Sequence, residues 1–527
     1  MSFSGVVVLT DLDDYIAPSQ ACILPVEVKK NENEGARTSI VVDDLGGYYE
    51  VSENGAEVKL ERASITLNDC LACSGCITSA ESILLTMQSQ EELYKVLKAN
   101  KDATEAGNLQ DVKTVVVSIA PQSRASLAAK YGLTPLQTAN RLTHFFKSLG
   151  VHYVLDTSFS RDFSLIETAN EFIERFRVYQ QHQSSTLPSP SLPSVRNASN
   201  PSRRKNAMGK GVGAGSTENT AMTKARLPML ASACPGWICY AEKTHGFVLP
   251  YISEIKSPQQ IMGLLVKDYI AETLGLRSSQ IYHVSVMMCY DKKLEASRSD
   301  FFSTANQTRD VDCVLTTGEI AQMFLEKSFS LADSPEAPLD RFTKMTSEKK
   351  ILGSYGSASG GYLEYVMRCA ARELFGVDVD VEKEKGVVVK IGRNKDFKEV
   401  VLEINSKPVL RFAQANGFRN IQNLVRKIKS GSSPYHYVEV MACPSGCING
   451  GGQLKPDEGE IPLKEWINRV NNVYKSVDCS YPEENESVMR LYDEWLGGRA
   501  SSKAQMMLRT QYHNVETSLV NPLAVKW

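Results

Sequence analysis

The positions of four cysteines constrain what this chain can fold into more than any other feature of its sequence. Cys289 and Cys443 each end a run of apolar residues typical of a buried strand, and Cys234 precedes the Pro-Gly turn of "ACPGW". Parallel strands present ligands at the edge where their carboxyl ends meet. One helical turn would place Cys443 and Cys447 on the same face. Each cysteine alone would be interpreted as a core residue, but together the four thiols favour a buried metal centre.

A second group of cysteines lies near the N-terminus. Cys70, Cys73 and Cys76 form the run "CLACSGC". Three thiolates on a tight turn can hold three corners of a cubane iron–sulfur cluster, and the fourth ligand must come from elsewhere. Cys22 is assigned this role by elimination, because it is the only other cysteine in the first 200 residues. Zinc is the alternative, although zinc sites use paired cysteines more often than such a triplet.

Composition and charge exclude several classes of protein. The 527 residues predict about three domains. The 59 basic and 61 acidic residues give a net charge of -2, so no global field attracts nucleic acid or an anionic membrane. The first residues lack the features of a signal peptide or a mitochondrial presequence, and no apolar run is long enough to span a bilayer. We therefore expect a protein of the cytoplasm, or also of the nucleus, whose cysteines stay reduced.

The alternation of strand and helix patterns predicts an α/β fold. Residues 115–119 form an apolar, β-branched strand, Pro121 ends it, and an alanine-rich helix follows. A further helix, Gly150 and another strand come next. Such alternation implies parallel strands covered by helices. Residues 181–225 are rich in Ser, Pro, Gly and Asn with few apolar residues, which predicts a disordered linker.

Five segments resemble, in order, the active-site motifs of iron-only hydrogenases. They are "ACPGW", "VMMCYDKKLEASR", "DVDCVLTTGEIAQM", "SASGGYLEYVMRCA" and "VEVMACPSGCINGGGQ". The resemblance extends over about residues 110–515. It implies an α/β, iron-only hydrogenase-like, two-lobed fold with parallel or mixed sheets, plus an N-terminal ferredoxin-like cluster-binding segment. A buried cluster is expected where the strand ends of the two lobes meet.

The chain is accordingly divided into six segments. They are an N-terminal cluster-binding segment (1–110), the start of the first lobe (111–180), the linker (181–225), the body with the buried cluster (226–455), a small helical segment (456–515) and a tail (516–527).

The resemblance also implies roles for individual residues. One 4Fe-4S cluster is expected on four body cysteines, Cys234, Cys289, Cys443 and Cys447. In hydrogenases the cysteine matching Cys447 also bridges to a di-iron unit, and a further cysteine before the Cys-Pro turn shuttles protons. Here Ala233 occupies that position, and its methyl group cannot carry a proton. Lys292 matches a lysine that contacts an iron-bound cyanide, and an ordinary ion-paired lysine is an equal alternative.

Loss of the shuttle thiol beside a single cysteine triplet resembles one eukaryotic offshoot, the NAR/NARF-like family of the cytosolic iron–sulfur assembly pathway. This resemblance implies two 4Fe-4S clusters, one on Cys22, Cys70, Cys73 and Cys76. It implies cluster delivery from an early P-loop NTPase scaffold to target apoproteins through a late targeting complex, without hydrogenase activity. The alternatives are an active iron-only hydrogenase or other redox enzyme, and a zinc-stabilised interaction protein.

The last residues and the remaining cysteines have simpler interpretations. Trp527 with a free carboxylate suits capture in a partner's pocket, and the pathway uses a C-terminal aromatic tripeptide as a recognition signal for the targeting complex. Lys526 departs from the usual middle residue, so an incidental terminus is an equal interpretation. Core packing or exposure accounts for four other cysteines, although Cys239 lies close to Cys234 in sequence. These are Cys239, Cys313, Cys369 and Cys479.

Overall fold

The computed structural model describes short strands within residues 6–66, residue 85, and residues 87–185, 226–392, 394–457 and 459–514. The chain divides into two compact units, residues 1–86 and 87–527. In the first unit, β1 (Val6–Val7) pairs antiparallel with β5 (Ile65–Thr66). A separate antiparallel sheet contains β2 (Thr38–Val42), β3 (Tyr48–Ser52) and β4 (Glu57–Lys59).

Several predictions fall outside the described residues. The first concerns the N-terminal cluster on Cys22, Cys70, Cys73 and Cys76. The others concern most of the linker (186–225) and the tail (516–527), which includes Lys526 and Trp527.

Two predicted boundaries are wrong. α4 (Gln90–Glu105) was expected in the N-terminal segment, but it belongs to the second unit, where Leu93 is fully buried in the core of the first sheet. The N-terminal unit therefore ends at residue 86 rather than 110. The linker was expected to begin at residue 181, but α7 (Thr157–Ser185) continues through its first five residues. Burial of apolar side chains sets the first boundary, and continuation of a helix that has already formed sets the second. The amino-acid composition of a segment reveals neither effect.

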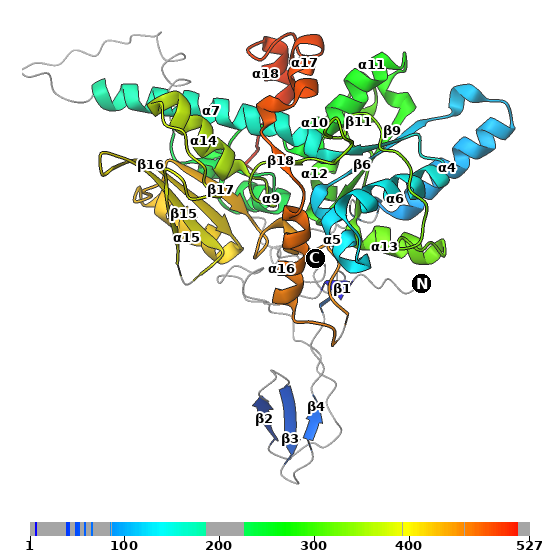
Figure 1. The fold of residues 1–527 in the computed structure, drawn as a ribbon, viewed down its shortest axis with the longest axis horizontal. Coiled ribbons are helices and arrows are strands. Elements are labelled where there is room, and N and C mark those ends of the chain that lie inside the picture. Colours follow the sequence, from blue (N-terminus) through cyan, green and yellow to red (C-terminus); the bar gives the residue numbers. More distant parts are fainter. Residues whose placement is uncertain are drawn as a thin grey trace, which may run out of the picture. The chain divides into compact units, whose positions relative to one another are not determined.

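A four-stranded parallel sheet lies at the centre of the first lobe. Its strands run in the order β12 (Cys313–Thr316), β9 (Ile281–Met287), β6 (Thr114–Ile119) and β7 (Tyr153–Asp156). The strand and the following helix predicted around Pro121 are β6 and α5 (Pro121–Tyr131). Helices α5, α6 (Pro135–Ser148) and α13 (Thr317–Glu326) cover the sheet (Figure 1). The expected parallel arrangement is confirmed here.

The second lobe contains a five-stranded mixed sheet. Its order is β14 (Val388–Ile391), β15 (Phe397–Ile404), β16 (Lys407–Asn416), β17 (Tyr437–Met441) and β8 (Met229–Ala231). The pairs β16–β17 and β17–β8 are parallel, and β14–β15 and β15–β16 are antiparallel. One face packs against α7 and α14 (Tyr362–Phe375), and the other against α9 (Pro235–Thr244) and α15 (Phe418–Lys429) (Figure 1).

One apolar core joins the two lobes. It contains Val116 and Leu155 from the parallel sheet together with Phe412 and Tyr437 from the mixed sheet. Phe172 of α7 contacts the rings of Phe412 and Tyr437, with centroids 5.0 and 5.5 Å away. α7 thereby holds the two sheets in a fixed relation, because close-packed cores resist displacement.

The C-terminal helices complete the second unit. α16 (Leu463–Lys475) packs on α5, and α17 (Glu486–Glu494) and α18 (Ser502–Leu508) follow it. All three lie within the small helical segment expected at residues 456–515. Within the described part of the chain, no helix combines the length and the apolarity that crossing a membrane requires.

Candidate metal centre

The ends of three strands position the four body cysteines. Cys289 lies two residues after β9, and Cys443 lies two residues after β17. Cys234 is the N-cap of α9 and lies three residues after β8. Cys447 begins a 3-10 turn (Cys447–Asn449) shortly after Cys443. Because β8 and β17 are parallel neighbours in one sheet and β9 belongs to the other, the ligand candidates come from both lobes.

The four thiols lie close enough to influence one another. Burial raises the pKa of Cys289 well above its ordinary value, and Asp291 and the other three thiols raise it further. Burial also raises the pKa of Cys443, followed by the charges of Cys234 and Cys447. Nevertheless, no three Cys, His, Asp or Glu side chains among the described residues are placed to hold one metal ion.

The site is buried and provides donors to sulfur. Cys234, Cys289 and Cys443 are 7–8 % exposed. The backbone N–H of Ala442 donates to Sγ of Cys234 at 3.4 Å. Such an N–H stabilises a thiolate more than a thiol. Four thiols that must ionise in a buried pocket require nearby positive charge, and an iron–sulfur core fits that requirement.

Cys447 is held by a serine on a separate loop. Its backbone N–H donates to Oγ of Ser359 at 3.1 Å, and its thiol lies 3.9 Å from the Ser359 carbonyl oxygen. Burial raises the pKa of the Cys447 thiol to about 12. Sγ of Cys447 also lies 4.0 Å from Sδ of Met441. Sγ of Cys447 thus lies next to a backbone carbonyl oxygen and a second sulfur atom.

Glycines allow the Cys447 loop to approach the Cys289 loop. The N–H of Gly452 donates to the carbonyl oxygen of Met288 at 2.9 Å. A Cβ atom at Gly450 would collide with that same oxygen, whereas a Cβ at Gly451 would meet nothing closer than 4.0 Å. The close approach of the two loops therefore requires that Gly450 lack a side chain.

Ala233 and Lys292, which stand at positions of hydrogenase motifs, both have defined contacts in the structure. Ala233, directly before Cys234, is half-buried and packs against the main core. Nζ of Lys292 lies 2.8 Å from Oε2 of Glu295, and both side chains are nearly buried. Ser257 and Gln259 donate to the same carboxylate oxygen, each at 3.0 Å. Lys292 therefore forms an ion pair in this structure.

Sequence reasoning missed a group of buried polar atoms. Oε1 of Gln259, both amide atoms of Gln260 and Oε1 of Glu439 have no hydrogen-bond partner within the described structure. Burial and the charge of Glu364 raise the pKa of Glu439 to about 7. The available signal was a glutamate inside the buried strand "YVEVM" of β17. Unsatisfied buried groups each cost about 1–3 kcal/mol, so their presence here is typical of a functional region.

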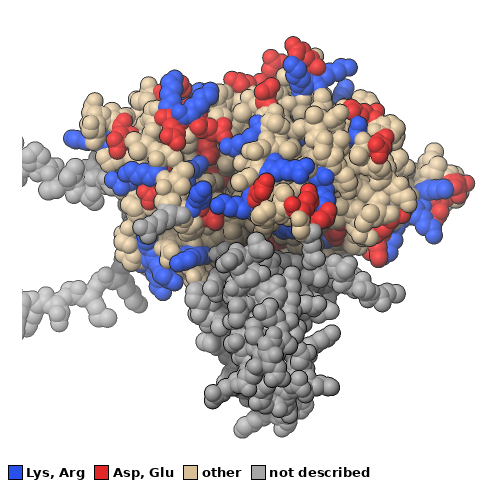
Figure 2. All heavy atoms as spheres, turned by 60° about the horizontal axis from the view of Figure 1, so that its bottom comes forward, with Lys and Arg blue, Asp and Glu red and all other residues tan. Residues whose placement is uncertain are grey.

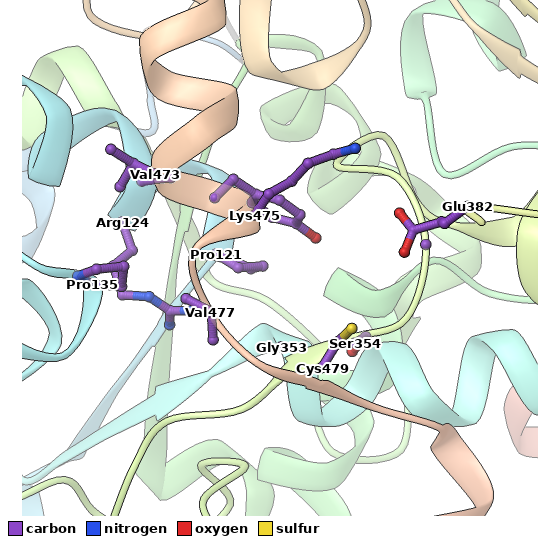
Figure 3. A pocket seen from close by; sticks show the side chains of 13 residues that line it. Pro121, Arg124, Pro135, Gly353, Ser354, Glu382, Val473, Lys475, Val477 and Cys479 are labelled. Atoms are coloured by element: carbon purple, nitrogen blue, oxygen red, sulfur yellow. The ribbon is translucent and has the colours of Figure 1, made fainter.

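The remaining described cysteines lie outside this group of thiols. Cys313 and Cys369 are buried core residues, as expected, and Cys239 is half-buried. Cys479 is exposed and lines a cavity of about 220 Å³ together with Arg124, Tyr474 and Lys475. Figure 3 shows Cys479 beside Ser354, in agreement with the pairing of their short strands β18 (Cys479–Ser480) and β13 (Gly353–Ser354). None of the four ligand candidates lines this cavity.

Two family models match most of the second unit. Residues 113–197 and 213–451 match the family described as "Iron only hydrogenase large subunit, C-terminal domain". Residues 464–515 match the family described as "Iron hydrogenase small subunit".

Curated relatives match over the full length. A Xenopus tropicalis protein named "Cytosolic Fe-S cluster assembly factor narfl" is 52% identical over 527 residues, covering 100% of this chain and 99% of the relative. A Mus musculus protein named "Cytosolic iron-sulfur assembly component 3" is 50% identical over 526 residues, with the same coverage. Among solved structures, an apo FeFe-hydrogenase HydA1 variant from Chlamydomonas reinhardtii is 27% identical with a TM-score of 0.60, covering 76% of this chain and 95% of that chain.

Proposed function

This chain belongs to the cytosolic iron–sulfur cluster assembly factors that share the iron-only hydrogenase fold, and we propose that it binds two 4Fe-4S clusters and mediates their delivery without hydrogenase activity. Its role is in cytosolic iron–sulfur protein assembly. The word "cytosolic" in the relatives' names supports a cytoplasmic location and offers no support for the nucleus.

The body cluster is assigned to four ligands, Cys234, Cys289, Cys443 and Cys447. The convergence of strand ends from both lobes supports this assignment. When bound, the cluster supplies one-electron chemistry and four metal–sulfur bonds. The residues of the chain keep the site dry, direct the Ala442 N–H to sulfur, and join the two loops through the Gly452–Met288 hydrogen bond. We therefore expect this cluster to be inert and largely structural.

The observation that carries the non-catalytic proposal is the environment next to Cys234. Ala233 offers no group that can donate or accept a proton. The nearby Lys292 ammonium is already paired with Glu295. A complete set of four thiols beside a missing proton carrier fits a protein that binds a cluster and does not reduce protons.

The N-terminal cluster is assigned to Cys22 and the triplet Cys70, Cys73 and Cys76. The C-x2-C-x2-C spacing and the family membership support this proposal. Its position on a short turn leads us to expect a more exposed and more labile cluster than the one in the body.

The protein partners belong to the cytosolic assembly machinery. We assign the donor as an early P-loop NTPase scaffold and the recipient as the late targeting complex, which passes clusters to target apoproteins. Capture of the Trp527 side chain and carboxylate is the proposed contact with the targeting complex. Removal of Trp527 should abolish co-purification with the targeting complex and leave the iron content unchanged. Co-purification at the full level would overturn this contact.

One preparation distinguishes this function from its alternatives. Anaerobically purified protein should contain about eight irons with matching sulfide. The likeness to a hydrogenase structure favours the enzyme alternative, which requires infrared bands from bound cyanide and carbonyl and hydrogen evolution from reduced dye. Either result would overturn the proposal. Zinc without sulfide would support the zinc-stabilised protein instead.

A further inference from the structure

The outward face of α15 carries cations near both of its ends. Ile421, Leu424, Val425 and Ile428 are buried against the mixed sheet. The exposed positions include four cations, Arg419, Arg426, Lys427 and Lys429. The surrounding segment, residues 383–430, contains twelve Lys and Arg but only four Asp and Glu, in a chain whose net charge is -2. Figure 2 shows Lys and Arg side chains together at the lower left of the body, the side where Figure 1 places α15.

These cations are not neutralised by neighbouring carboxylates. None of the four forms an ion pair with a carboxylate of the described residues, and neither does Arg411 on the adjacent strand β16. Their contacts are with rings and amides. Nζ of Lys427 lies 5.6 Å from the ring centroid of Tyr435, and Nζ of Lys429 lies 5.9 Å from that of Phe247, which is 39 % exposed.

Two carboxylates of the same segment form hydrogen bonds with other groups. Glu399 accepts a hydrogen bond from the hydroxyl of Tyr435. Asp396 is partly buried and accepts from the backbone N–H of Ser445 at 2.7 Å. Local ion pairing therefore does not account for the charge on this face.

Helix stability accounts for only part of this charge. Cations in the last turn, such as Arg426, Lys427 and Lys429, complement the negative end of the helix dipole. Arg419 stands in the first turn, where a cation is unfavourable and where α15 has no acidic residue. The helix is held in place by its apolar side and begins at Gly417, whose φ is 78°. The basic face is thus a rigid surface. It carries positive charges near both ends of the helix that no carboxylate of the described residues pairs with.

We propose that this basic face, made of Arg419, Arg426, Lys427 and Lys429 of α15 with Arg411 of β16, is a docking surface for an acidic segment of a partner protein. The proposal goes beyond cluster binding and does not depend on which residues hold the clusters. The face is about 18 Å long, from twelve residues at 1.5 Å each. A strand of about five residues or a helix of about twelve has the same length.

The charge of the whole chain favours a short protein segment over a nucleic acid or a membrane. Fields of exposed charges are screened within about 8–10 Å at physiological salt. A short acidic segment experiences only the local positive field, whereas a long polyanion or a vesicle also meets the acidic remainder of a chain with net charge -2. Nucleic-acid-binding domains are typically basic overall, and this chain has a pI of about 6.4.

Charge reversal on the helix tests the proposal in the full-length, anaerobically purified protein. The probe is a fluorescein-labelled peptide of about twelve residues, mostly Glu and Asp, and binding is followed by fluorescence anisotropy. The double variant Arg426→Glu/Lys427→Glu should weaken peptide binding about tenfold, because two attractions become repulsions. The affinity for wild-type protein should also fall as salt rises from about 50 to about 200 mM.

A matched control changes the net charge of the chain by the same amount as the test variant. Lys464→Glu/Lys503→Glu changes two exposed lysines of α16 and α18 that form no ion pair with described carboxylates. This variant should bind the peptide within about twofold of wild type. Equal losses in both variants would overturn the proposal, because only net charge would then matter. So would tighter binding of the wild-type face to single-stranded RNA or to phosphatidylserine vesicles than to the peptide. The iron content and the circular dichroism spectrum of both variants should equal those of wild type. A change in peptide binding then reports on the basic face and not on the clusters or the fold.

Discussion

The thiol of Cys234 accepts a hydrogen bond from the backbone N–H of Ala442 across 3.4 Å, and this contact links the residues that follow β8 and β17. The two partners are 208 residues apart in the sequence. Cys443 is the next residue after Ala442. The hydrogen bond therefore brings two of the four ligand candidates into one local unit, and the glycine loop after Cys447 connects this unit to Cys289 in the other lobe.

Loss of a body ligand should destabilise the whole second unit. We expect Cys447→Ala to lose about four of eight irons and to collapse the fold, because metal–sulfur bonds would no longer join the two lobes. Iron content, soluble yield and the circular dichroism spectrum measure this. Cys369→Ala is the control, since Cys369 is buried in the core away from the site. Equal yield and unchanged iron in Cys447→Ala would contradict the assignment.

Loss of a triplet ligand should have a different effect. Cys73→Ala is expected to lose the labile iron, about four per chain, while the melting temperature of the second unit stays within about 2 °C. The exposed Cys479 supplies a control, Cys479→Ala, which should keep all of the iron. If Cys73→Ala retained the iron content of wild type, the N-terminal cluster would be assigned to the wrong residues.

A methyl group at Gly450 should separate the two loops. The new Cβ of Gly450→Ala would collide with the carbonyl oxygen of Met288, and such overpacking costs about 1–3 kcal/mol. We expect lower stability in urea denaturation and reduced body iron. Gly451→Ala, one residue later, has open space and should behave like wild type. Similar behaviour of both variants would show that the close approach has no role.

The Lys292–Glu295 pair should behave as a buried structural pair. Glu295→Ala leaves the ammonium of Lys292 nearly buried and unpaired, so we expect a loss of about 3 kcal/mol. Lys292→Met/Glu295→Met should lose less, because neither charge remains. The exposed pair of Lys350 and Glu348 is the control, and Glu348→Ala should cost less than about 1 kcal/mol. A double variant as unstable as Glu295→Ala would refute this interpretation.

His436 should make the fold sensitive to mild acid. Burial, with a further contribution from Arg411, lowers the pKa of His436 from 6.5 to about 4. Its Nδ1 accepts a hydrogen bond from the Arg411 backbone N–H at 3.1 Å, which requires the neutral ring. The unfolded chain binds the proton more tightly, so stability should fall as pH drops from 6.5 toward 4.

Substitution at this histidine tests the pH dependence. His436→Asn keeps an acceptor and removes the titration, and it should reduce the acid-induced loss by about 2 kcal/mol in urea denaturation. His144→Gln serves as the matched histidine control. A pH profile of His436→Asn that overlaid the wild-type profile would assign the acid sensitivity to other groups.

The sequence by itself determined the local features of this protein. Apolar, β-branched runs placed β6, β9 and β17, and the residues after them placed Cys289 and Cys443 at strand ends, because strand patterns depend on near neighbours. The same local pattern identified α5 after Pro121. The ordered motifs then indicated the family.

Only the tertiary structure decided which distant segments meet. It joined Sγ of Cys234 to the backbone N–H of Ala442, buried Glu439 without a partner for one oxygen, and moved α4 into the second unit. It also left the outer face of α15 without carboxylate partners among the described residues. These features depend on packing between segments up to several hundred residues apart. The periodicity of apolar residues is a local property. It does not identify which distant side chains a segment will contact when the two lobes pack around a common core.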